Sequence, residues 1–224
     1  MKRIKVLVVD DHTIVREGLR TLIKLEDDFE VVGEARTGRE AVVQYKNLQP
    51  DVVLMDIAMP LLNGLEATRQ MLKANPAAKV LILSAHSDDA KVKNATESGA
   101  RGFLLKQSSA RDVCLAIREV HQGKQFFSPS IARRQERIRP SATKRAGGSS
   151  EKITSLTTRQ VEVLQLIAEG KANKEIAAEL GIVLKTAEKH REHVMQKLDI
   201  HDTAGLTRYA ISAGIIESSV QVDH

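Results

Sequence analysis

Short apolar segments that end in a polar residue most constrain how this chain folds. The clearest runs from Val52 to Met55, with Pro50 before it, Asp56 at its end and Pro60 shortly after. A short run rich in β-branched residues and bounded by prolines predicts a strand buried on both faces of a parallel sheet. Three further runs of this kind are residues 4–9 before Asp10 and Asp11, residues 80–83 before Ser84, and residues 102–105 before Lys106.

Segments with helical spacing of their apolar residues lie between these predicted strands. One follows Asp11, another ends before Asn75 and Pro76, and a later one ends at Gly123. With a further short strand at residues 31–34, the alternation of five strands with five helices predicts a doubly wound α/β domain, a (βα)5 fold, over residues 1–124. Because parallel strands end at a common sheet edge, where α/β proteins bind ligands, we expect the polar residues after the strands to lie together.

The residues expected at this edge suit phosphoryl chemistry with a metal ion. Asp10, Asp11 and Asp56 would repel one another unless a cation lay among them. Carboxylate oxygens favour Mg²⁺, for which the neighbouring His12 is a poor ligand. Asp56 can then act as a covalent nucleophile. Lys106 and Ser84 can hold the phosphoryl oxygens.

The rest of the chain predicts a linker and a second, all-α domain. Residues 125–150 hold six basic residues and a Gly-Gly-Ser-Ser sequence, which predict a flexible linker. Its charges either remain solvated or contact phosphates of nucleic acid. Residues 151–224 contain four helical patterns, and Thr157, Asn173 and Asp202 are candidate N-caps. The turn at Gly181 between the second and third patterns predicts a helix-turn-helix within a four-helix domain.

The net charge of +5 and the pI of 9.3 are not evidence for binding of nucleic acid, because of where the charge lies. Residues 128–150 hold six basic residues and one acidic residue, whereas residues 151–224 hold nine basic and eleven acidic residues. Any argument for DNA binding must therefore rest on local geometry. We find no apolar run of the roughly 18 residues needed to cross a membrane. The single cysteine, Cys114, permits no internal disulfide, so we expect a cytoplasmic protein.

Residues 1–124 resemble the receiver domain of two-component response regulators, and residues 151–224 resemble a LuxR-type DNA-binding domain. Together they are similar to regulators of the NarL/FixJ group. The matching sequences are Val-Val-Asp-Asp-His at 8–12, Asp-Val-Val-Leu-Met-Asp-Ile-Ala-Met-Pro at 51–60, Leu-Ile-Leu-Ser-Ala-His at 81–86 and Gly-Phe-Leu-Leu-Lys at 102–106, followed by Leu-Thr-Thr-Arg-Gln, Asn-Lys-Glu-Ile-Ala and Lys-Thr-Ala-Glu-Lys-His in the second domain.

The resemblance implies a transcriptional regulator, not an enzyme, that is controlled by phosphorylation. Asp56 would accept a phosphoryl group from a sensor histidine kinase and become 4-aspartylphosphate. Asp10, Asp11, Asp56 and the Ala58 carbonyl would bind Mg²⁺. Lys106 and Ser84 would bind the phosphoryl group, and the Phe103 ring would turn inward behind Ser84. Phosphorylation would favour a homodimer that binds promoter DNA, without any membrane partner.

The resemblance also assigns DNA contacts to the second helix of the helix-turn-helix. Glu188, Lys189 and Glu192 would face the bases. Intrahelical pairing of the two glutamates with Lys185 or Lys189 is an equally good interpretation. The candidates for contacts with phosphate are Lys174, Lys185, Thr186, His190 and Arg191. The apolar side of the last helix, with Leu206, Tyr209, Ala210 and Ala213, forms either a dimer interface or part of the core.

Two other functions compete with this one. A phosphatase of the haloacid dehalogenase type also uses an aspartate nucleophile with Mg²⁺, but it needs a second acid two residues after the nucleophile. In Asp10-Asp11-His12 that position is a histidine. The other alternative is a binding protein whose acidic site only shapes a protein contact. Magnesium-dependent labelling by acetyl phosphate would distinguish it from a phosphate acceptor.

Overall fold

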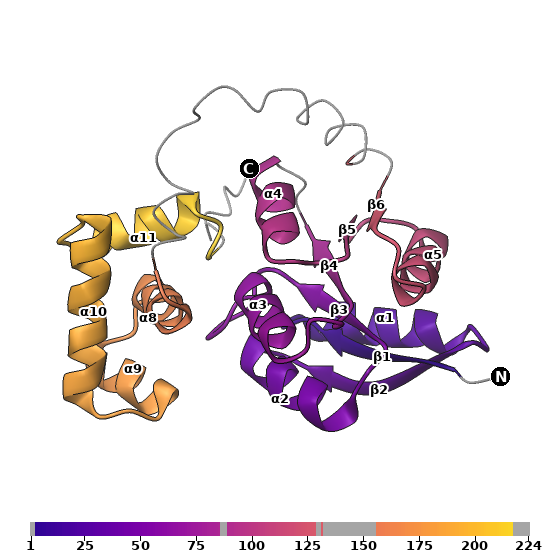
Figure 1. Ribbon diagram of the computed structural model, residues 1–224, viewed down its shortest axis with the longest axis horizontal. Coiled ribbons are helices and arrows are strands. Elements are labelled where there is room, and N and C mark those ends of the chain that lie inside the picture. The colour runs from indigo at the N-terminus through magenta and orange to yellow at the C-terminus, as the bar shows by residue number, and fades with distance from the viewer. Residues whose placement is uncertain (1–2, 86–88, 129–130, 132–155, 217–224) are drawn as a thin grey trace. The chain divides into compact units, whose positions relative to one another are not determined.

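The computed structural model describes residues 3–85, 89–128, 131 and 156–216. The chain divides into two compact units, residues 1–144 and 145–224. Figure 1 shows the sheet and helices of the first unit and the helices of the second. His86 of the sequence motif and most of the predicted linker lie outside the described residues.

The first unit is a parallel sheet with helices on both faces, which confirms the predicted doubly wound fold. Its strand order is β2-β1-β3-β4-β5-β6, and every neighbouring pair is parallel. The elements are β1 (Ile4–Val9), α1 (Thr13–Lys24), β2 (Phe29–Ala35), α2 (Gly38–Leu48), β3 (Val52–Asp56), α3 (Gly64–Ala74), β4 (Val80–Ser84), α4 (Asp89–Glu97), β5 (Gly102–Leu105), α5 (Ala110–His121) and β6 (Phe126–Phe127).

Alternate residues of the central strands supply two cores, one on each face of the sheet. Val53 and Met55 of β3 pack in the cluster that includes residues of α2, α3 and α4. Val52 and Leu54 pack in the cluster that includes residues of α1 and α5. Burial on both faces explains why β3 lacks a polar residue before Asp56. The two helical layers are visible in Figure 1.

The short strand β6 was not predicted from the sequence. Phe126 pairs with Gly102 and Phe127 with Phe103, so β6 extends the sheet beyond β5. Both phenylalanines lie inside the segment 125–150 that we expected to be a linker. Aromatic residues favour strands, and the open edge of β5 offers unpaired backbone groups to them.

The described part of the second unit, residues 156–216, forms four helices, as predicted. They are α8 (Thr158–Ala168), α9 (Asn173–Leu180), α10 (Leu184–Leu198) and α11 (Thr203–Ser212). Thr157 and Gln160 form the predicted capping box of α8, and Asp202 accepts a hydrogen bond from the Gly205 amide at 2.7 Å to cap α11. Gly181 ends α9 with a φ of 62°, in the left-handed conformation that glycine adopts readily.

The structure refines two of the predictions for this unit. Asn173 is the first residue of α9 and not its cap, because the helix begins one residue earlier than expected. Ala172 is the N-cap residue, and its backbone amide donates to Glu175 Oε2 at 2.8 Å. On α11, Leu206 and Ala210 are fully buried, whereas Tyr209 is only half-buried; the C-cap residue Ala213 is nearly fully buried. The apolar side of α11 is therefore mainly core of its own unit.

Candidate functional site

Two carboxylates lie side by side at the carboxyl ends of the central strands. Asp10 directly follows β1 and Asp56 is the last residue of β3. These strands are neighbours, with Val9 opposite Met55. Both carboxylates are buried, with Asp10 fully covered and Asp56 2% exposed. The expectation that strand ends gather the acidic residues at one edge agrees with this geometry.

Lys106, which follows β5, reaches both carboxylates. Its Nζ lies 2.8 Å from Asp10 Oδ2 and 3.0 Å from Asp56 Oδ2. Burial would by itself lower the pKa of the Lys106 ammonium, but the charge of Asp56 and the contacts with Asp10 outweigh it and raise that pKa. Lys106 is therefore charged at neutral pH and can attract further negative charge to this edge.

The Asp56 carboxylate is unusually basic for an aspartate. Burial raises its pKa to about 7, the charges of Asp10 and Asp11 act in the same direction, and Lys106 opposes them. The single cation Lys106 thus does not fully compensate the three neighbouring carboxylates. A second cation at the site would favour the ionised, nucleophilic form of Asp56.

The donor atoms at this edge fit such a cation. Asp10, Asp11, His12 and Asp56 each place one possible ligand atom within 4.8 Å of the others. Asp10 Oδ2, Asp11 Oδ1 and Asp56 Oδ2 are buried, and none accepts a hydrogen bond among the described residues. Their close neighbours are Lys106 Nζ, which forms ion pairs with Asp10 Oδ2 and Asp56 Oδ2, and His12 Nδ1, which lies 2.7 Å from Asp11 Oδ1. Buried oxygens of this kind suit a hard cation such as Mg²⁺.

His12 and Ala58 lie beside this cluster. His12 is largely exposed, and its Nδ1 contacts Asp11 Oδ1 at 2.7 Å, so it pairs with an acid instead of completing the oxygen cluster. Ala58 lies in the loop after β3, two residues beyond Asp56.

Ser84 and Phe103 lie on β4 and β5, the next two strands of the sheet after β3. Ser84 ends β4 and is 1% exposed, and its carbonyl accepts from the Lys106 amide at 2.8 Å. Phe103 on β5 pairs with Ile82 of β4, and its ring is fully buried in the core. The ring is therefore part of the hydrophobic core of this unit, and its movement behind Ser84 stays a prediction.

Two residues that support the acidic site were missed from the sequence. Arg16 of α1 is 4% exposed and donates to the carbonyls of Asp10 and Asp11 at 2.8 and 3.1 Å. Gly64 begins α3, and a Cβ at this position would overlap the carbonyl oxygen of Asp56. Asn63-Gly64 indicated only a turn, because a pattern along the chain does not show which backbone lies against it.

In the second unit, α10 presents its charged residues to solvent. Lys185, Glu188, Lys189 and Glu192 are exposed, as is Lys174 of α9. Glu192 accepts from Gln196 Nε2 at 3.2 Å. Within the described residues, no ion pair joins Glu188 or Glu192 to Lys185 or Lys189. The structure thus does not support the interpretation of intrahelical ion pairing, and all four side chains are exposed to solvent.

The other candidates for phosphate contacts, Thr186, His190 and Arg191, are partly buried. Burial, with nearby Arg159, holds the pKa of His190 below its ordinary value, so its ring is neutral at pH 7. Arg191 donates to Asn173 Oδ1 at 3.4 Å and to Thr203 Oγ1 at 2.7 Å. Arg191 therefore connects α9, α10 and α11.

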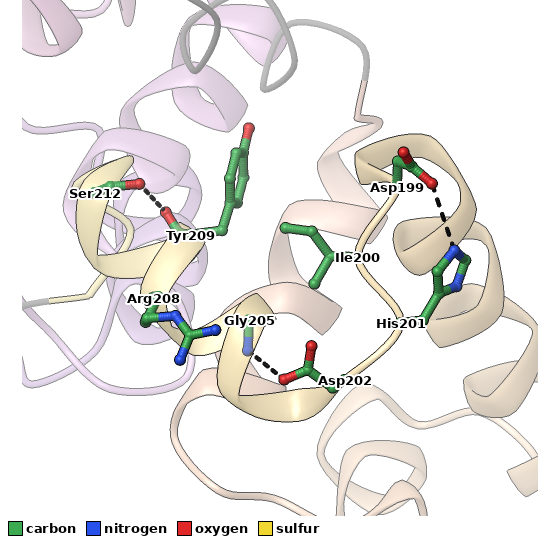
Figure 2. Close-up of a pocket in the computed structure, with 8 residues that line it drawn as sticks. All are labelled: Asp199, Ile200, His201, Asp202, Gly205, Arg208, Tyr209 and Ser212. Atoms are coloured by element: carbon green, nitrogen blue, oxygen red, sulfur yellow. Dashed lines mark hydrogen bonds and ion pairs between the residues drawn. The ribbon is translucent and has the colours of Figure 1, made fainter.

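A shallow depression of about 660 Å³ lies at the turn between α10 and α11 (Figure 2). Its acidic groups have structural partners: Asp202 caps α11, and Asp199 contacts His201 at 3.5 Å. Tyr209 lines it as well, and burial raises the pKa of Tyr209 to about 12. The depression is therefore formed by the connection between α10 and α11 and by α11 itself.

Comparisons with known proteins match both units. Residues 6–118 match the family described as response regulator receiver domain, and residues 154–210 match bacterial regulatory proteins of the luxR family. The response regulator protein VraR of Staphylococcus aureus is 37% identical over 96% of this chain and 99% of its own.

Solved structures of two proteins resemble nearly the whole chain. ChrA, the response regulator of a heme-sensing two-component system, is 31% identical, with 96% of this chain and 100% of its own covered and a TM-score of 0.52. RcsB of Salmonella typhimurium is 26% identical, with 95% and 100% covered and a TM-score of 0.57. A DNA complex of RcsB gives a TM-score of 0.58 at 26% identity, with 95% and 99% covered.

A receiver domain with an acidic edge, joined to a helix-turn-helix domain, defines a transcriptional response regulator. This chain belongs to the LuxR-type response regulators of two-component systems. The resemblance drawn from the sequence is thereby confirmed, and the phosphatase interpretation loses its support. No described helix is both long and apolar enough to cross a membrane.

Proposed function

We propose that Asp56 accepts a phosphoryl group from the phosphohistidine of a sensor kinase and that this change controls DNA binding by α10. The observation that supports the proposal most strongly is the convergence of Asp10, Asp56 and Lys106, with Lys106 Nζ within 3.0 Å of both carboxylates. The same chemistry makes the chain its own catalyst for phosphorylation and dephosphorylation, although it is a regulator.

In the transfer, an Asp56 carboxylate oxygen attacks phosphorus while the bond to the histidine nitrogen breaks. Lys106 neutralises charge on the phosphoryl oxygens, and Ser84 donates to one of them. Asp10, Asp11, Asp56 and the Ala58 carbonyl would hold Mg²⁺, which supplies positive charge for both the carboxylates and the phosphoryl group. The buried oxygens without hydrogen bonds support this ligand set.

We further propose that the phosphoryl group changes the surface near Ser84 and Phe103. An aspartylphosphate adds negative charge beside the Ser84 hydroxyl, and movement of that hydroxyl would fix the Phe103 ring in its inward position. The resulting surface would favour a homodimer. The two domains would comprise residues 1–124, extended by the strand β6, and residues 151–224, with the rest of residues 125–150 as the linker between them.

On DNA, α10 would enter the major groove with its exposed residues Lys185, Glu188, Lys189 and Glu192. Glu188, Lys189 and Glu192 would reach base edges, where lysine can pair with guanine and glutamate with cytosine. Lys174 and Lys185 are exposed and are the strongest candidates for phosphate contacts, with Thr186, His190 and Arg191 as further candidates. RcsB, similar in fold, has been solved in complex with DNA, which supports this assignment.

Labelling with radioactive acetyl phosphate tests the acceptor. We expect incorporation that requires Mg²⁺ and that is lost in the Asp56→Asn variant. Asp27→Asn, at an exposed position in the same domain, should label normally. Normal labelling of Asp56→Asn would exclude Asp56 as the acceptor, and unlabelled wild type would favour the alternative of a binding protein.

A further inference from the structure

Two exposed apolar residues lie at the start of the helix that we propose reads DNA. Val183 is 70% exposed and Leu184 is 46% exposed. Leu184 lies four and eight residues before Glu188 and Glu192, so the three share one face of α10. The buried face of α10 is formed by other residues, namely Ala187, Val194 and Leu198. Leu184 is thus the first residue of the exposed face that also carries Glu188 and Glu192.

Val183 and Leu184 are not explained by a need to stabilise α10. Val183 is the N-cap residue of the helix, and its side chain accepts no hydrogen bond. Valine is among the poorest N-caps, whereas Thr157 and Asp202 cap α8 and α11 in the same unit. Single exposed apolar residues are common on protein surfaces. Two adjacent ones at the start of this helix, in place of a cap, indicate a contact surface.

We propose that Leu184, with Val183 beside it, contacts the C5-methyl groups of thymine in the major groove. The inference rests on the proposed function of α10. In a helix-turn-helix, residues at the amino end of the second helix lie nearest the base edges. The thymine methyl is the apolar group exposed there. The pair adjoins exposed Lys185 and Lys189, which can contact DNA phosphates, and it shares its face with exposed Glu188 and Glu192, which can accept from cytosine.

Replacement of thymine by deoxyuridine removes only this methyl group and tests the inference directly. Duplexes that bind the phosphorylated full chain are first selected from random sequence, and each thymine is then replaced in turn. We expect wild type to bind about fourfold more weakly at one or two positions, the effect of losing one buried methyl. Leu184→Ala should bind both forms equally, and Leu184→Met should retain the preference.

Ile211→Ala is the matched control, because Ile211 is an exposed apolar residue of the same domain, 38% exposed on α11. This variant should discriminate between thymine and uracil as wild type does. If wild type binds both duplexes equally, or if Leu184→Ala keeps the full preference, the inference is wrong while the proposed function stands. If wild type selects no DNA sequence at all, both are wrong.

Discussion

At the scale of single residues, the acidic site carries more negative than positive charge. Binding of a cation or protonation of a carboxylate is therefore favoured there. Asp56 is buried beside Asp10 and close to Asp11, and Lys106 is the cation that contacts both buried carboxylates. The folded protein therefore tolerates an ionised Asp56 less well than the unfolded chain does. Mg²⁺ and a phosphoryl group would each change this balance.

Asp56→Asn should therefore stabilise the metal-free protein at high pH. Burial raises the pKa of Asp56 from 3.8 to about 7, so its ionisation removes stability as pH rises through that range. The variant cannot ionise, so we expect its free energy of unfolding at pH 8 to exceed that of wild type by about 1–3 kcal/mol. The difference should vanish near pH 4 and shrink when Mg²⁺ is added.

Denaturant unfolding at several pH values measures this effect. Asp27→Asn removes an exposed carboxylate from the same domain and should leave the pH dependence unchanged. An Asp56→Asn variant that is less stable than wild type at pH 8 would show that Lys106 already compensates the buried charge.

At the scale of elements, the loop into α3 fixes where β3 ends. Gly64 lies against the carbonyl of Asp56, and its own amide donates to the Ile57 carbonyl at 2.9 Å. Gly64→Ala should displace this backbone and lower the rate of labelling by acetyl phosphate at least tenfold. Gly18→Ala is the control, since a Cβ there meets nothing within 4 Å, and it should label normally. Equal labelling of both variants would contradict this role for Gly64.

In the second unit, we expect different residues to determine stability and DNA binding. Arg191 bonds to Asn173 on α9 and to Thr203 at the start of α11, whereas Lys189 is exposed on α10. Arg191→Ala should lower the free energy of unfolding by about 1–2 kcal/mol, because two hydrogen bonds are lost. Lys189→Ala should keep its stability and lose DNA affinity. If Arg191→Ala instead kept its stability and lost DNA affinity, Arg191 would act only as a DNA contact.

The sequence predicted those elements whose signal is local. Buried strands, helix caps and the turn at Gly181 are determined by residues next to one another, and parallel strands bring Asp10, Asp56 and Lys106 to one edge whatever the loops do. Contacts between distant segments carried no such signal. Arg16 against the Asp10 carbonyl, Gly64 against Asp56 and the pairing of β6 with β5 depend on the packing of the complete unit.

At the scale of the whole molecule, charge limits how tightly one copy can hold DNA. Residues 151–224 carry nine basic and eleven acidic residues, so a single domain lacks the excess of positive charge that drives strong binding. Two linked copies on paired half-sites would multiply weak affinities. The proposed dimer therefore makes specific binding possible for a domain of this composition.

Spacing between half-sites tests this dependence on two copies. Insertion of about 5 base pairs between selected half-sites rotates one by half a turn and should weaken binding of the phosphorylated protein at least tenfold. Insertion of about 10 base pairs restores the helical face and should recover part of the loss. Affinity that is insensitive to either insertion would mean that each copy binds independently.

The most direct test of the account is the affinity of the full chain for a selected duplex before and after phosphorylation, with intact mass to confirm the modification. We expect acetyl phosphate with Mg²⁺ to raise the affinity of wild type by about 5- to 150-fold, the usual range of coupling between sites. The affinity of Asp56→Asn should not change. Stoichiometric phosphorylation of wild type with unaltered DNA affinity would contradict the link between the acidic site and α10.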